Sequence, residues 1–234
     1  MKSNSTEKFE EELVWILSHI QGSNQQKKMI IYVRSINTCY NMFLWLVSAI
    51  GEDFFIHGTP ALQNRRVEMF HANTDEASKT RILEDFSKQS GSIQVLISTV
   101  AFGMGINLPD VDIVIHWGLP NSSLSYWQEV GRCARDGRPG YAICYAFKRS
   151  ITKCTDESLK HLVKLESCSR CIVLKNFLLE GMGLQDMDIL LQDIPCSGDC
   201  EEQCMCKNCK CCEVCYSQCK CPRKVMNSLQ SFLK

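Results

Sequence analysis

The sequence lacks long apolar runs, and this absence excludes two classes of protein. No run approaches the roughly 18 uninterrupted apolar residues that a membrane-spanning helix needs, so we expect no membrane partner. Met1 to Thr6 is polar, without the apolar core of a secretion signal, which favours an intracellular protein. With 234 residues, 45% of them hydrophobic and 22% charged, the chain can bury one sizeable core and a small appendage.

An excess of charge of either sign is also missing. The 26 Lys and Arg residues match the 26 Asp and Glu residues, and the two signs balance separately over 1–150 and 151–234. No basic domain therefore attracts nucleic acid through its overall field. If this protein meets DNA or RNA, it must use a few placed residues or the surface of a partner.

Cysteine is abundant instead, and its distribution is uneven. The chain has 16 cysteines, of which 10 lie between Cys196 and Cys221. Secreted disulfide-rich modules reach such densities, but here the dense tail follows a long cysteine-poor stretch without an export signal. This context favours thiolate ligation of a metal over disulfides.

Short apolar runs alternate with amphipathic segments over the first two thirds of the chain. Strands alternating with helices give a parallel sheet covered on both faces, so the pattern predicts an α/β fold. The expected strands are 29–33, 93–97, 111–115 and 141–147, and the expected helices are 9–20, 38–49, 76–88 and 123–130. Residues 22–28 read as a polar linker, 53–64 as a loop of unknown placement and 159–179 as a further helix.

Two segments carry residues suited to chemistry. The first, Ser98 to Pro109 (STVAFGMGINLP), follows an expected strand directly and so lies at the carboxyl edge of the sheet, where open α/β sheets bind ligands. Gly103 and Gly105 permit close backbone approach, and Ser98 and Thr99 could hold a phosphate oxygen. Taken alone, a tight connection is the simpler interpretation of this pattern.

The second segment, Gln128 to Gly137 (QEVGRCARDG), places Arg132 and Arg135 three residues apart on one predicted helical face. Two guanidinium groups aimed the same way suit a polyphosphate, and an arginine presented to a developing phosphoryl charge is a device of nucleotide hydrolases. The alternative is a solvated helix end in which Arg135 pairs with Asp136 or Glu129.

Together these segments resemble motifs V and VI of superfamily 2 helicases, and STVAFGMGINLPDV and QEVGRCARDGRPG are similar to the RecQ family in particular. The resemblance includes MIIYVRS, similar to motif IV, and it extends over residues 29–150 as a second RecA-like domain. It implies that Arg135 is an arginine finger, that Arg132 contacts phosphate and that Gln128 helps to organise the cleft between two such domains. It assigns nucleotide or DNA contacts to small and polar residues of both motifs: Ser98, Thr99, Gly103, Gly105, Asn107, Glu129 and Gly131.

One departure from the RecQ pattern lies between the two arginines. Cys133 and Ala134 stand where RecQ proteins usually carry Ala-Gly. Both residues are small, so we expect the arginines to keep their direction, although Ala134 adopts positive φ less freely than glycine.

The cysteines resemble the same family, whose second RecA-like domain is followed by a helical zinc subdomain. By that resemblance Cys168 opens a helix and Cys209, Cys212 and Cys215 form the triplet, giving a closed, structural Zn²⁺ site. In one alternative, Cys168 and Cys171 ligate together and displace a member of the triplet. In another, a second zinc site is built from the remaining cysteines of the tail: Cys196, Cys200, Cys204, Cys206, Cys211, Cys219 and Cys221.

The predicted organisation has four parts. Residues 1–28 form a leading helix and linker, 29–150 the second RecA-like domain, 151–221 a small helical, cysteine-rich zinc subdomain with an insertion, and 222–234 a tail. The phosphate loop GxxxxGKS/T and the acidic Mg²⁺ motif of a first RecA-like domain are missing from the sequence. Asp75-Glu76 follows no apolar strand and instead reads as a helix start capped by Thr74.

The resemblance implies the C-terminal motor half of an ATP-dependent 3′-to-5′ DNA helicase, acting in the nucleus in DNA repair and recombination. Its implied cofactors are ATP with Mg²⁺, and Zn²⁺. Its implied partners are single-stranded DNA or a duplex junction, and a first RecA-like domain in cis or in trans. We expect this chain to be a fragment that is inactive by itself. The alternatives are a non-enzymatic DNA-binding or interaction module, and a metal-binding cysteine-rich protein on a relic helicase domain.

Overall fold

The computed structural model of the chain describes residues 8–22, 27–99, 111–133, 140–178, 181–182 and 212–219. Contacts divide the chain into two compact units, one of residues 1–120 with 125–153 and the other of residues 121–124 with 154–234. The four-part division expected from the sequence stays a prediction.

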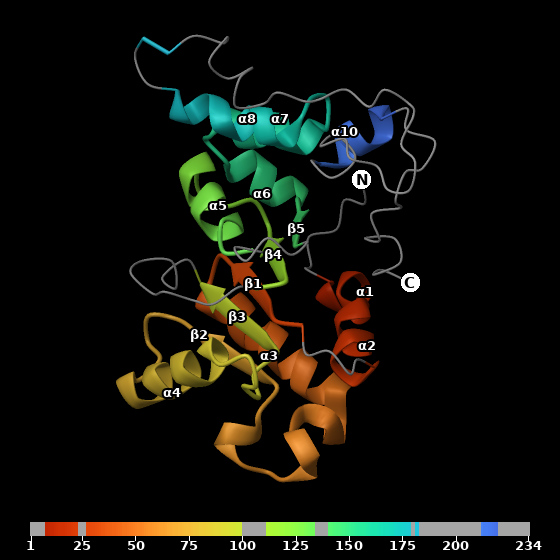
Figure 1. Ribbon diagram of the computed structural model, residues 1–234, viewed down its shortest axis with the longest axis vertical. Coiled ribbons are helices and arrows are strands. Elements are labelled where there is room, and N and C mark those ends of the chain that lie inside the picture. The colour runs from red at the N-terminus through yellow and green to blue at the C-terminus, as the bar shows by residue number, and fades with distance from the viewer. Residues whose placement is uncertain are drawn as a thin grey trace. The chain divides into compact units, whose positions relative to one another are not determined.

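A five-stranded parallel sheet lies at the centre of the first unit (Figure 1). Its order is β2-β3-β1-β4-β5, and all four neighbouring pairs are parallel. The strands are β1 Met29–Val33, β2 Val67–Phe70, β3 Val95–Thr99, β4 Ile113–Trp117 and β5 Tyr141–Tyr145. The predicted α/β class with a parallel sheet is therefore confirmed. The predicted bounds of β1 are also confirmed, whereas β3 begins at Val95 rather than Ile93, and β4 at Ile113 rather than Val111.

Three predicted helices of this unit are present, and local caps explain two of their starts. They are α3 Ile36–Ile50, α4 Glu76–Ser87 and α5 Ser123–Val130. The Ser35 side chain accepts a hydrogen bond from the Thr38 N–H and so caps α3. Asp75 accepts from the Ser78 N–H and caps α4, so the prediction that Thr74 is the cap is wrong.

Helices cover both faces of the sheet. On one face Ile82 and Phe86 of α4 pack against Ile30, Leu96 and Val114, which share that face because side chains alternate along a strand. On the other face the Phe9 ring lies 5.8 Å from that of Trp45 in α3 and 6.0 Å from that of Trp117 in β4. The central strands are consequently buried along their whole length, as parallel strands require.

The N-terminal segment departs from the predicted single helix over 9–20. It forms α1 Phe9–Glu12 and α2 Val14–Gly22, separated at Leu13, whose φ of −108° and ψ of 7° are not helical. Leu13 is fully buried, so the interruption between α1 and α2 lies against the core. The loop expected over 53–64 contains three short 3-10 helices: η1 Gly51–Phe54, η2 Ile56–Gly58 and η3 Leu62–Asn64.

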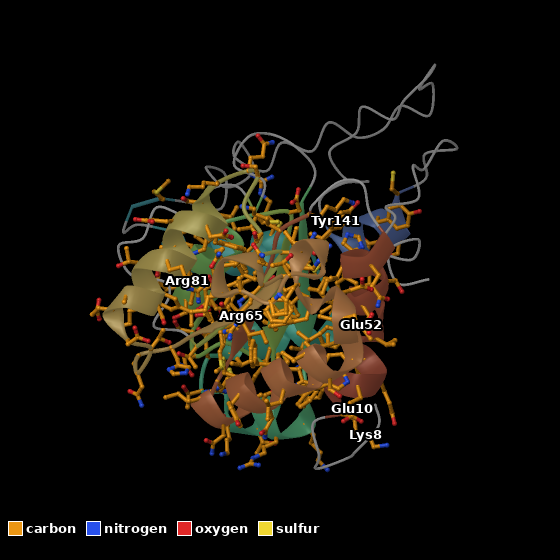
Figure 2. All side chains as sticks on the ribbon, turned by 90° about the horizontal axis from the view of Figure 1, so that it is seen from below. Lys8, Glu10, Glu52, Arg65, Arg81 and Tyr141 are labelled. Atoms are coloured by element: carbon orange, nitrogen blue, oxygen red, sulfur yellow. The ribbon has the colours of Figure 1, made fainter. Side chains whose placement is uncertain are left out.

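Strand β2 was not predicted, and a buried charge accounts for the omission. Glu68 interrupts its apolar pattern but is only 4% exposed. Its Oε1 lies 2.6 Å from Arg81 Nη2 and 3.6 Å from Arg65 Nη1, two arginines labelled in Figure 2. This pairing offsets the cost of burying the carboxylate and makes a strand possible.

Short helices make up the described part of the second unit. They are α7 Glu157–Lys164, α8 Ser169–Leu174, η5 Lys175–Phe177 and α10 Glu213–Gln218, while α6 Lys148–Lys153 belongs to the first unit. The predicted helix over 159–179 is interrupted at Leu165, which adopts the left-handed conformation (φ 54°). Asp156 caps α7 by accepting from the Leu159 N–H, and it also accepts from the Ser123 N–H. Within the described ranges, no helix is both long and apolar enough to cross a bilayer.

Candidate functional site

The carboxyl edge of the sheet holds the start of the first predicted segment. Ser98 and Thr99 end β3, and Ser98 lies beside Tyr32 of β1, which lies beside His116 of β4. Ser98 is fully buried, with its hydroxyl 3.0 Å from the Phe70 carbonyl oxygen and 2.8 Å from that of Thr99. The Thr99 side chain is partly exposed. Gly103, Gly105 and Asn107 lie outside the described residues, so their predicted contacts stay predictions.

The second predicted segment begins in α5 and leaves it through a turn. The helix ends at Val130, so the prediction that Arg132 projects from a helical face is wrong. The Gly131 N–H donates to the Trp127 carbonyl oxygen, and a Cβ at position 131 would lie 3.0 Å from that same oxygen. Glycine therefore suits this turn. Arg135 lies outside the described residues.

The predicted residues of this segment differ in exposure. Gln128 is exposed, whereas Glu129 is 3% and Arg132 5% exposed. The Arg132 N–H donates to the Glu129 carbonyl oxygen, and the Arg132 carbonyl oxygen accepts from the Val111 N–H. Backbone hydrogen bonds thus fix the position of Arg132 beside the start of β4.

Glu129 has a partner that the sequence analysis did not identify. His116 Nε2 lies 2.7 Å from Glu129 Oε2, and the two side chains are 2% and 4% exposed. His116 is therefore a core residue of the first unit. Only the tertiary fold brings together a strand residue and a helix residue that are 13 positions apart.

Three of the four predicted zinc ligands come together in the second unit. The Sγ atoms of Cys168, Cys212 and Cys215 all lie within 4.8 Å of one another. Cys168 is the N-cap residue of α8, and Cys212 is that of α10. Cys209 lies outside the described residues. Cys171, which forms the alternative CxxC pair with Cys168, is not part of this group of thiols.

These three thiols suit a thiophilic cation such as Zn²⁺. Burial, followed by the neighbouring Cys168 and Cys212, raises the pKa of Cys215, because a thiolate there meets little water and further sulfur atoms. A bound Zn²⁺ reverses this preference, since it stabilises thiolates as ligands. Three sulfur donors leave room for a fourth, as a tetrahedral structural site requires.

The family described as the helicase conserved C-terminal domain matches residues 8–137. A protein of Acanthamoeba polyphaga mimivirus, named as an ATP-dependent RNA helicase, is 36% identical over 129 residues, which cover 47% of this chain and 23% of the relative. The ATP-dependent DNA helicase RecQ of Haemophilus influenzae is 33% identical over 137 residues, covering 50% of this chain and 22% of the relative.

Among solved structures, the C-terminal domain of the DEAD-box protein Dbp5 is 20% identical to this chain. The match has a TM-score of 0.49 and covers 81% of this chain and 93% of that domain. The matches to the two curated helicases, in contrast, span less than a quarter of either relative's length.

Proposed function

Because this chain belongs to the helicase conserved C-terminal domain family and is RecQ-like, we propose that it is the second motor domain of an ATP-dependent 3′-to-5′ DNA helicase. The observation that carries the proposal is the sequence QEVGRCARDG, which begins in a helix packed on a parallel sheet and continues into a turn fixed beside β4. In this role the chain contributes one side of an ATP site and part of the surface that binds the nucleic-acid backbone.

The proposed ATP chemistry is phosphoryl transfer to water, and this chain supplies charge to it. Arg135 acts as the arginine finger and Arg132 as a second cationic contact, and Gln128, which is exposed on α5, helps to organise the site. An arginine placed where negative charge develops stabilises the transition state more than bound ATP. A first RecA-like domain, in cis or in trans, holds ATP and Mg²⁺ against these residues.

The proposed DNA contacts come from Thr99, at the end of β3, and from the residues that follow it in the sequence. Thr99, Gly103, Gly105 and Asn107 offer hydroxyl, amide and backbone N–H donors, which suit phosphate oxygens. Glycines let the backbone approach a strand closely. Since the net charge is zero, these placed donors rather than a basic surface provide the contact.

The proposed metal site is structural. Cys168, Cys212 and Cys215, with Cys209 as the fourth ligand, hold Zn²⁺ and thereby join the starts of α8 and α10. When bound, the ion supplies cross-linking of the chain, because four thiolates leave no open position for catalysis.

Substitution of Arg135 tests the proposed motor role. The assay combines this chain with a RecQ-type first RecA-like domain and measures ATP binding and DNA-stimulated ATP hydrolysis. We expect Arg135→Ala to lower kcat by about 10³-fold or more while ATP affinity changes little. Arg149→Ala removes the same charge from an exposed position and is the matched control. If hydrolysis survives Arg135→Ala, the proposal is wrong.

RNA is a second candidate substrate, because the mimivirus relative is named as an RNA helicase. This chain combined with a RecQ-type first RecA-like domain distinguishes the two substrates, since ATP hydrolysis is measured with single-stranded DNA and with RNA of equal length. We expect DNA to stimulate hydrolysis more strongly, and stronger stimulation by RNA would assign the chain to RNA.

A further inference from the structure

A buried hydrogen bond joins the middle of the sheet to the helix that carries the predicted motor residues. His116 on β4 and Glu129 on α5 approach to 2.7 Å between Nε2 and Oε2, with both side chains almost completely buried. Glu129 directly follows Gln128 and stands three residues before Arg132. The bond thus reaches the segment that the proposed function assigns to ATP hydrolysis.

Aromatic rings hold the imidazole in one orientation. The ring of Tyr32, which lies opposite His116 in the parallel register, stacks on it at 5.4 Å between centroids and 19° between planes. The ring of Tyr126 lies 5.2 Å away at 44°. Nδ1 of His116 has no hydrogen-bond partner among the described residues, so Nε2 makes the directed polar contact of this side chain.

Helix α5 and the turn that follows it are attached to the β4 segment at two points. The first is the contact between His116 and Glu129 near the carboxyl end of β4. The second is the hydrogen bond from the Val111 N–H to the Arg132 carbonyl oxygen, just before the strand begins, where Val111 also forms a parallel bridge with Cys133. One attachment is made by side chains and the other by the backbone.

We propose that His116 is a positioning residue of the motor, which acts through Glu129 to fix the end of α5 and the turn at Gly131 and Arg132, from which the sequence continues to Arg135. The inference rests on the proposed function. A buried polar pair adds little net stability over a well-packed apolar pair, but its hydrogen bond fixes how the two side chains are oriented. A small displacement of a catalytic group lowers the reaction rate. Because the proposed arginines stabilise the transition state, we expect their displacement to lower kcat and to leave ATP binding nearly unchanged.

Three variants of this chain, each combined with a RecQ-type first RecA-like domain, test the role. His116→Phe keeps a ring against Tyr32 but removes the donor, and we expect kcat for ATP to fall about 10- to 100-fold while KM changes less than about threefold. His116→Gln places an amide donor near the position of Nε2, so we expect it to recover most of kcat. Cys144→Ala, opposite His116 on β5, is the matched control and should leave kcat unchanged.

A double variant keeps the test decisive if His116→Phe does not fold. Loss of the imidazole leaves the Glu129 carboxylate buried without this partner, and His116→Phe/Glu129→Leu removes that charge. We expect the double variant to melt cooperatively and still to show the reduced kcat. A double variant that folds with wild-type kcat, or a His116→Gln variant as slow as His116→Phe, overturns the proposal.

The assay separates this inference from the proposed function. If the wild-type assembly hydrolyses ATP and Arg135→Ala abolishes hydrolysis, but His116→Phe keeps its kcat, only the positioning role is wrong. If the wild-type assembly is inactive, or Arg135→Ala has no effect, the proposed function fails and the role of His116 fails with it.

Discussion

At the residue scale, the first unit is organised by buried polar side chains whose partners come from other elements. Glu68 of β2 pairs with Arg81 of α4, and Glu129 of α5 bonds to His116 of β4. Burial of an unpaired polar group is costly, so each of these contacts restricts how its two elements can pack. Lys28 is a third such residue, and its side chain caps the C-terminus of α4.

Lys28 provides a stability prediction. Its Nζ donates to the carbonyl oxygens of Phe86, at 2.6 Å, and of Lys88, at the C-terminus of α4, and the side chain is buried. Lys28→Met keeps the aliphatic length but removes both donors, so we expect the free energy of unfolding to fall by about 2 kcal/mol in urea denaturation. Lys88→Met, at an exposed side chain, should change it by less than about 0.5 kcal/mol.

The difference in unfolding free energy between the wild type and Lys28→Met should depend on pH, and the pKa of Lys28 gives the sign. Burial lowers the pKa of Lys28 from 10.5, so the unfolded chain holds the proton more tightly than the folded chain. The wild type therefore gains stability relative to Lys28→Met as the pH rises from the folded pKa to 10.5. A difference in unfolding free energy that shrinks over this interval would contradict the assignment.

How far residues could be predicted from the sequence depends on how local their contacts are. The grouping of Cys168 with Cys212 and Cys215 agrees with the predicted site because the family resemblance already related these positions. The partner of Glu129 could not be predicted, since no local spacing relates it to His116. Arg132 was expected on a helical face because it stands three residues before Arg135, although the apolar pattern already ended the predicted helix at Val130, where α5 stops.

At the element scale, elements with strong apolar periodicity were predictable. Strand β1 and helix α5 have their expected bounds, because a continuous apolar run and a 3.6-residue pattern are distinctive signals. The leading helix was predicted as one element because its apolar pattern continues through Leu13, where the helix is interrupted. Helix α10 was missed because its six residues, of which Val214 and Cys215 are buried, are too few to show a helical apolar period.

The starts of α8 and α10 give an element-scale prediction about zinc. Because the Sγ atoms of Cys168, Cys212 and Cys215 lie together, we expect Cys168→Ser and Cys212→Ser to release one Zn²⁺ per chain, since a serine hydroxyl is a poor ligand. Metal content of the purified chain is the measurement, and loss of helical circular dichroism should accompany release. Cys171→Ser is the control and should retain the ion.

The total metal content separates the remaining alternatives. One Zn²⁺ per chain corresponds to the four predicted ligands alone, and two correspond to a second site among the other cysteines. Loss of zinc from Cys171→Ser would favour the CxxC alternative. Several loosely exchanging ions would instead favour the metal-binding protein on a relic domain.

At the scale of the whole molecule, the family match and the charge balance agree with the proposal that this chain is one motor domain and requires a second. The match to the helicase C-terminal domain family covers residues 8–137, and the phosphate loop that binds ATP in helicases is missing from the sequence. A chain without net charge also gains little from the general attraction between basic proteins and nucleic acid. Under the proposed function, ATP hydrolysis therefore requires complementing groups from a first RecA-like domain.

Reconstitution from two polypeptides tests this dependence. We expect the 234-residue chain alone to show no DNA-stimulated ATP hydrolysis above background, because its sequence contains no phosphate loop to hold the nucleotide against the proposed arginine finger. Addition of a RecQ-type first RecA-like domain should produce hydrolysis that rises with its concentration and saturates. The first domain alone, and the mixture with Arg135→Ala, are the controls and should remain near background. DNA-stimulated hydrolysis by the purified chain alone would mean that it carries a complete ATP site.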